Sequence, residues 1–300
     1  QDSCHVTGFL VIGAQEQSER GDAAFGATFI SMLENFLADG DPPVYRGWGS
    51  MTEGQSGLSP ENLLCLAIRS LKKAGKRGVI VAGWAELGID MLKGQPDEFE
   101  LGSYIAAAVC IVKSAPHEWL FPRCMVTVHH GGAGTVGAAL RSGVPTVITA
   151  TKVPDQIVNA QIVHHSGCGI NLGSLDCLTS EQLGTAISRC ASDVVMKAAC
   201  VDMRQRLLNE DGLGNAIFQI KKLVQEKLAT GDWQAQQNSL EACAGQCGFA
   251  KAAWHPTHCC GKCSIFPGSH GPKCAQVAMR WRGGDGGGGD GGSGKGGDMW

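Results

Sequence analysis

Residues 128–135 read Val-His-His-Gly-Gly-Ala-Gly-Thr, and no other run in this 300-residue sequence says more about its fold. The run follows an apolar, strand-like stretch, Cys124–Val128, and opens a helix of small residues, Thr135–Arg141. A strand, a glycine turn and a helix together present free backbone N–H groups to an anion. The two histidines at the end of the strand can add hydrogen-bond donors at the same place. The run therefore predicts a pyrophosphate site, such as a nucleotide requires.

Composition excludes several classes of protein. The formal net charge is −3 and no long basic stripe occurs, which argues against nucleic acid as a partner. The sequence has no run of 18 apolar residues, so nothing in it predicts a membrane span. Residue 1 is Gln and no secretory segment follows it, which favours a cytoplasmic piece of a longer or processed chain. The length predicts one or two domains.

Cysteine is used unevenly along the chain. Eight of the 14 cysteines are scattered through residues 1–200, mostly in apolar stretches, which indicates buried free thiols in a reducing compartment. The other six fall within residues 243–274, in a segment that needs a separate interpretation.

Short apolar runs alternate with helical patterns from about residue 43 to residue 228. The predicted strands are Val44–Arg46, Val79–Ala82, Val109–Val112, Met125–Val128, Val144–Thr149 and Gly169–Leu172, with a further short strand at Gly8–Gly13. The predicted helices are Phe25–Leu37, Pro60–Ala74, Thr135–Gly143, Asp155–His165, Glu181–Cys190, Val194–Asn209 and Gly214–Ala229. Such alternation predicts an α/β fold, a Rossmann-like parallel sheet covered by helices on both faces.

Local signals mark the ends of two of these helices. Ser59 precedes Pro60, which predicts an N-cap followed by proline at the first helical position. Gly75 follows the same helix as a candidate C-cap. Thr179 and Gln182 have the spacing of a capping box.

Beyond residue 231 the alternation stops. Residues 231–282 are an irregular appendix rich in Cys and His, and residues 283–300 form a glycine-rich tail that is expected to be disordered. The cysteine clusters suit zinc, with Cys243, Cys247, Cys259 and Cys263 as candidate ligands, although no standard zinc spacing fits. A disordered extension and a disulfide-bonded knot are the alternatives.

The glycine run also contains the spacing G-x-G-x-x-G over residues 132–137, which is the mark of dinucleotide binding. That fingerprint requires an acidic residue at the end of the next strand. Asp155 lies 18 residues after Gly137, but well past the strand, and the motif comes late in the series. A sugar-nucleotide site is therefore favoured over a dinucleotide site. A tight turn with no ligand is the third alternative.

Three further loops follow predicted strands and so lie at the same edge of the sheet, where parallel sheets bind ligands. The first, Arg46–Met51, is a glycine turn in which Ser50 offers a hydroxyl. The second, Ser114–Trp119, carries His117. The third carries Asp155 and Gln156, a pair that can hydrogen-bond vicinal hydroxyls such as those of a sugar.

Five segments, taken in order, resemble those of one family. Residues 42–51 resemble "PPVYIGFGSM", residues 76–84 resemble "GQRGII…GW", and residues 115–124 resemble "APHDWLFPRC". Residues 128–145 resemble "VHHGGAGTTAAGLRAGVP", and residues 209–212 read "NEDG". Residues from about His5 to Leu228 thus resemble the C-terminal, donor-binding half of a GT-B glycosyltransferase, of the UDP-glucose:sterol 3-beta-glucosyltransferase family of plants and fungi.

The resemblance implies a role for each matched residue. His130, Gly134 and Thr135 match contacts to the UDP diphosphate, in the turn to which Gly132 also belongs. Ser50 matches a phosphate-facing turn, and Ala115 and His117 match the segment that holds the uridine. Asp155 and Gln156 match residues that grip the glucose hydroxyls. The family works without a metal or other cofactor, so the resemblance implies none.

The resemblance also implies an activity and a domain plan. The activity is inverting transfer of glucose from UDP-glucose to a sterol or other lipid hydroxyl. Residues 1–40 are expected to be the end of an interdomain connection and residues 41–230 the donor domain. The acceptor site and catalytic base lie in the family's N-terminal half, so no catalytic residue is expected in this chain. That half would be on the same or another chain. A UDP-sugar-binding subunit that is inactive without it is the alternative function, and a relic with no ligand is a third.

One segment departs from the family. Residues 149–156 read Thr-Ala-Thr-Lys-Val-Pro-Asp-Gln, where many relatives have "PFFGDQ" before and at the donor sugar. The aromatic residues are missing and a lysine is added. Because sterols lie in membranes, the resemblance is compatible with a peripheral location at a membrane surface.

Overall fold

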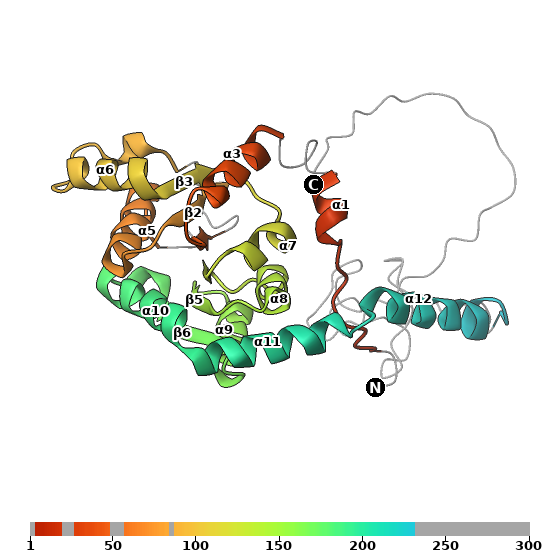
Figure 1. Cartoon of the computed structure of the whole chain (residues 1–300). Coiled ribbons are helices and arrows are strands. Elements are labelled where there is room, and N and C mark those ends of the chain that lie inside the picture. Colours follow the sequence, from red (N-terminus) through yellow and green to blue (C-terminus); the bar gives the residue numbers. More distant parts are fainter. Residues whose placement is uncertain (1–3, 20–26, 49–56, 84–86, 232–300) are drawn as a thin grey trace, which may run out of the picture. The chain divides into compact units, whose positions relative to one another are not determined.

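The computed structural model describes residues 4–19, 27–48, 57–83 and 87–231 (Figure 1). The chain divides between Asn215 and Ala216 into two units, and the first of them contains the whole sheet. The candidate residue Ser50 lies outside the described residues, and so do the zinc candidates Cys243, Cys247, Cys259 and Cys263. The glycine-rich tail also lies outside them.

The centre of the first unit is a sheet of six parallel strands in the order β3-β2-β1-β4-β5-β6. The strands are β1 (Val44–Gly47), β2 (Gly78–Val81), β3 (Val109–Val112), β4 (Val126–His129), β5 (Thr146–Ala150) and β6 (Gly169–Ser174). This is the Rossmann order. The predicted parallel α/β sheet is confirmed, with each strand from Val44 onward within about two residues of its predicted bounds.

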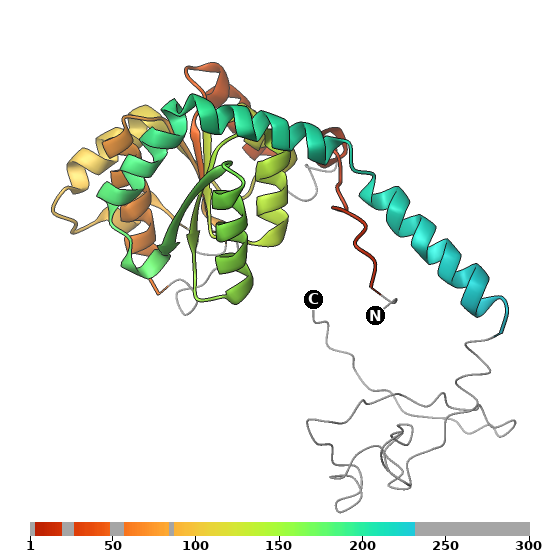
Figure 2. The ribbon, with the colours of Figure 1, turned by 90° about the horizontal axis from the view of Figure 1, so that it is seen from below.

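Helices cover both faces of the sheet, as Figures 1 and 2 show. The helices of the first unit are α1 (Ala14–Glu19), α3 (Ala27–Ala38), α5 (Pro60–Ala74), α6 (Glu98–Ala108), α7 (His117–Leu120), α8 (Ala133–Ser142), α9 (Pro154–His165), α10 (Ser180–Ser192) and α11 (Val194–Leu208). Most of α12 (Gly212–Leu223), which a π-helical turn continues (Val224–Leu228), belongs to the second unit. Helices α5 and α10 pack together on one face, and α7 and α8 lie on the other. Burial on both faces explains why the strands read as apolar runs rather than as alternating patterns.

The predicted helix caps are confirmed. The Ser59 side chain accepts a hydrogen bond from the backbone of Asn62, and Gly75 ends α5 in the left-handed conformation with φ 62°. Thr179 and Gln182 form both hydrogen bonds of a capping box at the start of α10. These local signals fixed the ends of α5 and α10 because each cap satisfies backbone groups that a helix leaves unpaired.

The predicted strand at Gly8–Gly13 is wrong. Residues 4–13 have no regular structure, and the helix α1 follows at Ala14. Phe9 of this segment lies against α8, since a Cβ added at Gly137 would come within 2.7 Å of the Phe9 ring. Val6 and Leu10 stay largely exposed instead of pairing with an edge strand. The sequence prediction also missed α6, whose buried residues are only Leu101 and Ile105, too few to give a clear helical stripe.

An arginine is fully buried in the central strand. Arg46 has 0% of its surface exposed, and Nη1 donates to the Ser70 hydroxyl of α5 at 2.6 Å. Its guanidinium lies 4.7 Å from the centre of the Trp48 ring. Nε and Nη2 have no hydrogen-bond partner among the described residues, and no carboxylate there pairs with it. Burial lowers the pKa of Arg46 from 12.5 to about 9, because a charge in this setting has lost its hydration.

Two sequence expectations concern thiols and membranes. The eight cysteines of the described part are free, and six of them are buried, as the apolar context predicted. Among the described residues, every helix is too short or too polar to cross a membrane.

Candidate functional site

The strand order places a crevice between β1 and β4. From β1 the chain continues toward β2 on one side, and from β4 it continues toward β5 on the other, so the connections diverge between these neighbours. Gly47 of β1 lies beside His129 of β4 at the carboxyl ends of the two strands. Ligands of open α/β sheets bind at such a switch point. The turn that the sequence singled out, residues 130–132, leaves β4 at this position.

His129 points into the protein and not toward the crevice. It is fully buried, and its Nδ1 accepts a hydrogen bond from the backbone N–H of Gly131 at 3.1 Å. Its Nε2 lies 2.9 Å from the Thr146 hydroxyl, which donates to the carbonyl of Thr127. Burial, with smaller contributions from His130 and His117, lowers the pKa of His129 to about 3. This neutral imidazole fixes the start of the glycine turn, so it is not the ligand donor that the sequence suggested.

The glycines of the turn allow a close approach between backbone and side chains. Gly131 has φ +93°, and a Cβ there would come within 2.9 Å of Ile148. A Cβ on Gly132 would lie 2.6 Å from Nε2 of His130. Asn159 of α9 donates to the Gly131 carbonyl at 2.8 Å. Glycine at 131 and 132 therefore lets the His130 ring lie over the start of α8.

The N-terminus of α8 carries no side-chain cap. Gly132 is its N-cap, and the first helical hydrogen bond is that from Val136 to the Gly132 carbonyl. The N–H groups of Ala133, Gly134 and Thr135 precede that bond and have no intrahelical acceptor. Space is open beside Gly134, where a Cβ would meet no atom within 4 Å. Unpaired N–H groups and the positive end of the helix dipole favour an anion here.

His130 adds a side chain to this anion site. Its Nδ1 is buried and has no hydrogen-bond partner among the described residues. Burial lowers the pKa of His130, and the nearby carboxylate of Asp155 partly offsets this. A neutral imidazole can still donate one hydrogen bond, so His130 can contact an anion without carrying a charge.

The third element at this edge is the first turn of α9. Asp155 is exposed there and interacts electrostatically with His130. Gln156 is buried, and its Oε1 accepts hydrogen bonds from the backbone N–H of Thr151 at 2.9 Å and from the Thr151 hydroxyl at 2.7 Å. Gln156 thus holds the loop between β5 and α9. Its predicted contact with a sugar stays a prediction.

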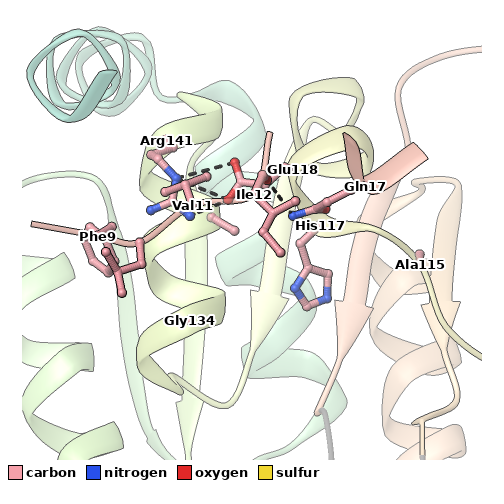
Figure 3. Close-up of a pocket in the computed structure, with 11 residues that line it drawn as sticks. Phe9, Val11, Ile12, Gln17, Ala115, His117, Glu118, Gly134 and Arg141 are labelled. Carbon is pink, nitrogen blue, oxygen red and sulfur yellow. Dashed lines mark hydrogen bonds and ion pairs between the residues drawn. The ribbon is translucent and has the colours of Figure 1, made fainter. Parts of the chain in front are cut away.

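A pocket of about 510 Å³ opens along one face of α8 (Figure 3). Its walls come from the N-terminal segment, from the start of α7 and from one face of α8: Phe9, Leu10, Val11, Ile12, Gln17, Ala115, His117, Glu118, Gly134, Ala138 and Arg141. Most of these side chains are apolar and a few are polar, as in pockets that hold small organic ligands. Gly134 belongs to both the anion site and the pocket, so the two are continuous.

His117 is held rigidly at the wall of this pocket. Its Nε2 lies 2.9 Å from the Tyr45 hydroxyl, and its ring stacks on Phe121 with centroids 4.5 Å apart. Burial, and secondarily His130, lowers the pKa of His117 to about 4, so the ring is neutral at pH 7. Burial raises the pKa of Tyr45, which keeps its hydroxyl protonated. With Tyr45 as the donor, the Nδ1–H of His117 becomes a hydrogen-bond donor.

An ion pair closes one side of the pocket. Arg141 of α8 binds Glu118 of α7 through Nε at 3.2 Å and also through Nη2, and both side chains are largely buried. The Arg141 guanidinium lies 4.9 Å from the Phe9 ring. Gly137 makes room for both, since a Cβ there would contact each of them within 3 Å. Gly137, the third glycine of the G-x-G-x-x-G spacing, thus faces the N-terminal segment. At the end of β5, Thr149, Ala150 and the following Thr151 include no acidic residue that could bind a ribose, as the dinucleotide fingerprint requires.

The structure brings most of the candidate residues to one edge of the sheet. His130, Gly132, Gly134 and Thr135 form the turn and helix start, and Ala115 and His117 line the adjoining pocket. The sequence interpretation missed the Phe9–Ile12 segment and the Glu118–Arg141 pair. The spacing of Gly134, Ala138 and Arg141 on one helix face was a signal that could have predicted the α8 wall. Among the described residues, no three His, Cys, Asp or Glu side chains are grouped so as to hold a metal ion.

Comparison with known proteins agrees with this geometry. A family model described as the erythromycin biosynthesis protein CIII-like, C-terminal domain matches residues 93–213. A sterol 3-beta-glucosyltransferase of Arabidopsis thaliana is 34% identical over 188 residues, which are 62% of this chain and 26% of that protein. A sterol 3-beta-glucosyltransferase of Aspergillus terreus is 31% identical over 217 residues, 72% of this chain and 14% of that protein. The chain therefore spans about a quarter or less of the length of these relatives.

Solved structures show the same fold. A UDP-glucose:anthocyanidin 3-O-glucosyltransferase in complex with UDP superposes with a TM-score of 0.51 at 16% identity, over 65% of this chain and 42% of that one. The glycosyltransferase VinC in complex with DTDP gives a TM-score of 0.50 at 21% identity, over 64% and 44%. The chain has the fold of the C-terminal, GT-B domain of these glycosyltransferases. The family model covers every described candidate residue of this GT-B domain, from Ala115 to Gln156.

Proposed function

We propose that this chain binds the sugar donor of a UDP-dependent glycosyltransferase. The observation that carries the proposal lies at the switch point of the sheet: among the described residues, no side chain caps the N-terminus of α8, and Nδ1 of His130 beside it has no hydrogen-bond partner. The diphosphate would lie on this helix end, where backbone donors and the helix dipole both favour negative charge. The nucleoside would occupy the adjoining pocket, between Ala115, His117 and α8. Asp155, exposed in the first turn of α9, would accept hydrogen bonds from hydroxyls of the sugar.

This arrangement stabilises the leaving group. Negative charge builds on the departing diphosphate as the bond to the sugar breaks, and preoriented N–H donors lower the energy of that transition state. The histidines near the site are neutral, so they act as hydrogen-bond donors and not as cations. Donors of this kind supply the electrostatic stabilisation for which other enzymes use a metal, and we propose that no metal is needed here.

The finer assignment is the transfer of glucose from UDP-glucose to a sterol or other lipid hydroxyl. The names of the relatives support it, since both the plant and the fungal proteins are sterol 3-beta-glucosyltransferases. Direct attack by a base-activated hydroxyl inverts the anomeric centre. The base and the acceptor site would lie in an N-terminal GT-B half, on the same or another chain. Because sterols lie in membranes, reaction with a sterol would require peripheral contact with a membrane surface.

Calorimetric titration of the chain with UDP tests the donor site. We expect saturable binding by the wild type and a loss of about tenfold or more in affinity for His130→Ala, since a hydrogen bond to a charged group is worth roughly 1.5–3 kcal/mol. His164→Ala is the matched control, because His164 is exposed in the last turn of α9. Wild-type chain that fails to bind UDP, or equal affinities for all three proteins, would disprove the donor site.

A transfer assay tests whether this chain supplies only the donor site, with the base in a separate N-terminal half. The chain is incubated with radiolabelled UDP-glucose and sterol in vesicles, and the lipid fraction is analysed for labelled product. We expect UDP binding without transfer, because the base lies outside this sequence. Sterol glucosylation by this chain alone would show that the base is here after all. Competition between UDP-glucose and other UDP-sugars in the same titration identifies the sugar.

A further inference from the structure

Two buried cysteines meet at the junction of β6 and α11. Cys168 immediately precedes β6, and Cys200 lies in the middle of α11. The Cys200 thiol donates to the carbonyl of Cys168 at 3.4 Å, and the Cys168 thiol lies 3.6 Å from the carbonyl of Ala199. Each sulfur therefore lies against the backbone of the segment that carries the other.

The surroundings give the two thiols different acidities. The neighbouring Cys200 thiol lowers the pKa of Cys168, and burial opposes this effect. Ser166 also favours the Cys168 thiolate, while the charges of Asp202 and Arg206 on α11 act in opposite directions. The same contact with Cys168, together with burial, raises the pKa of Cys200. A thiolate beside a protonated thiol is the arrangement of a nucleophilic cysteine and its resolving partner.

The third buried thiol of this region is chemically different. Burial raises the pKa of Cys190, which lies in α10, to about 12, so it stays protonated at neutral pH. Among the described residues, no three His, Cys, Asp or Glu side chains are grouped so as to hold a metal ion. We therefore interpret Cys168 and Cys200 as a dithiol and not as metal ligands.

The helix that carries Cys200 is held by a small buried surface. Only Met196 and Cys200 are buried in α11, whereas Val194, Val195 and Val201 are at least half exposed. Helices with so few buried apolar contacts open locally at a lower free-energy cost than the core. Opening of α11 would expose both sulfurs to a small oxidant without unfolding the sheet.

We propose that Cys168 and Cys200 are a redox-active pair that forms a reversible disulfide with a hydroperoxide as the oxidant. The Cys168 thiolate attacks the peroxide, which breaks the O–O bond and gives a sulfenic acid and hydroxide. The Cys200 sulfur then attacks the Cys168 sulfur, and the sulfenic oxygen leaves as water after protonation. Two thiols and one hydrogen peroxide thus yield one disulfide and two waters. A small thiol reductant reverses the change.

The disulfide would join the residue before β6 to the middle of α11. Helix α11 packs on α8, and a Cβ at Gly143, the C-cap of α8, would lie 2.9 Å from Arg204 of α11. The link would therefore fix the helix that supports the C-terminal end of α8.

Peptide mapping after oxidation tests the pair. The folded chain is treated with hydrogen peroxide, its remaining thiols are alkylated, and it is digested with trypsin without reduction. We expect mass spectrometry to find residues 153–189 linked to residues 198–204, and to lose this species after reduction with dithiothreitol. The longer peptide also contains Cys177, so the variants Cys177→Ser and Cys168→Ser separate the two candidates. The link is expected to persist in the first variant and to disappear in the second.

Three results would overturn the proposal. They are the absence of the linked peptide from folded, oxidised wild type, its persistence in Cys168→Ser, and a link from residues 153–189 to the Cys190 peptide instead. Because the positive result is read from wild type and from Cys177→Ser, which changes an exposed residue, the test does not depend on whether Cys168→Ser folds.

Discussion

Replacement of Arg46 by methionine is expected to stabilise the protein. Most buried arginines have a carboxylate partner, whereas Arg46 has only the Ser70 hydroxyl and the face of Trp48 among the described residues. Methionine fills a similar elongated volume without polar atoms. Ser70 remains satisfied in the variant, because its hydroxyl donates to the Ala67 carbonyl at 2.8 Å.

The size of the gain follows from the pKa of Arg46. A fall from 12.5 to about 9 on folding corresponds to a cost of about 5 kcal/mol at neutral pH, at 1.36 kcal/mol for each pKa unit. The hydrogen bond to Ser70 and the contact with Trp48, together worth roughly 1–3 kcal/mol, are lost with the guanidinium. We therefore expect Arg46→Met to raise the free energy of unfolding by about 2–4 kcal/mol, similar to other replacements of buried charges by apolar residues.

Urea denaturation followed by circular dichroism measures this change. The pH dependence gives a second signature: the folded pKa of Arg46 lies below the unfolded value, so the cost is complete below pH 9 and declines as the pH rises toward 12.5. The advantage of the variant should shrink above pH 9. Arg69→Met is the matched control and should destabilise slightly, because Arg69 pairs with Asp97 at 2.6 Å on a partly exposed surface. A variant at Arg46 that is no more stable than wild type would refute the reasoning.

Three further outcomes are expected. Gly132→Ala should abolish measurable UDP binding while the chain stays folded, since its Cβ would displace the His130 ring. Gly102→Ala is the control, because a Cβ there meets no atom within 4 Å, and equal affinities of the two variants for UDP would contradict the prediction. Buried His117 has a folded pKa of about 4 and stays neutral while the unfolded chain takes up a proton, so it should lower the free energy of unfolding by about 1–3 kcal/mol as the pH drops from 6.5 to 4. Buried His129, with a folded pKa of about 3, adds to this fall, so His117→Gln should reduce the slope without removing it, and an unchanged slope would count against the prediction. Thr179→Ala should cost about 1 kcal/mol in chemical denaturation through loss of the capping box, and a neutral result would show that the cap does not contribute.

Much of the fold was predictable because its signals are local. Each strand between Val44 and Gly169 reads as an apolar run, and the glycine turn after β4 is explicit in the sequence. The caps at Ser59 and Thr179 depend on residues no more than three positions apart. The failure at Gly8–Gly13 has the opposite origin. An apolar run favours burial in a strand, but here the run lies beside the pocket with its side chains, such as Leu10 and Ile12, about half exposed or more.

The candidate site was predictable by position and not by orientation. His129 and His130 are adjacent and looked equivalent in the sequence, yet successive residues at the end of a strand point to opposite sides. The His129 ring is buried against Thr146, and the His130 ring, at the start of α8, has a nitrogen with no partner among the described residues. The roles of Asp155 and Gln156 divide in the same way, since one side chain is exposed and the other is buried under the loop that it holds.

The sequence by itself determined the alternating α/β plan and the glycine turn at residues 130–132, because periodicity and backbone freedom are properties of neighbouring residues. Only the tertiary structure decided that the Phe9 segment lines the pocket, that Arg46 is buried with no carboxylate partner among the described residues, and that Cys168 meets Cys200. These contacts join residues far apart in the chain, and their energies depend on which groups exclude water from one another. A local sequence pattern does not predict which groups lose contact with water, because water is excluded only when the sheet and its helices pack around the side chains.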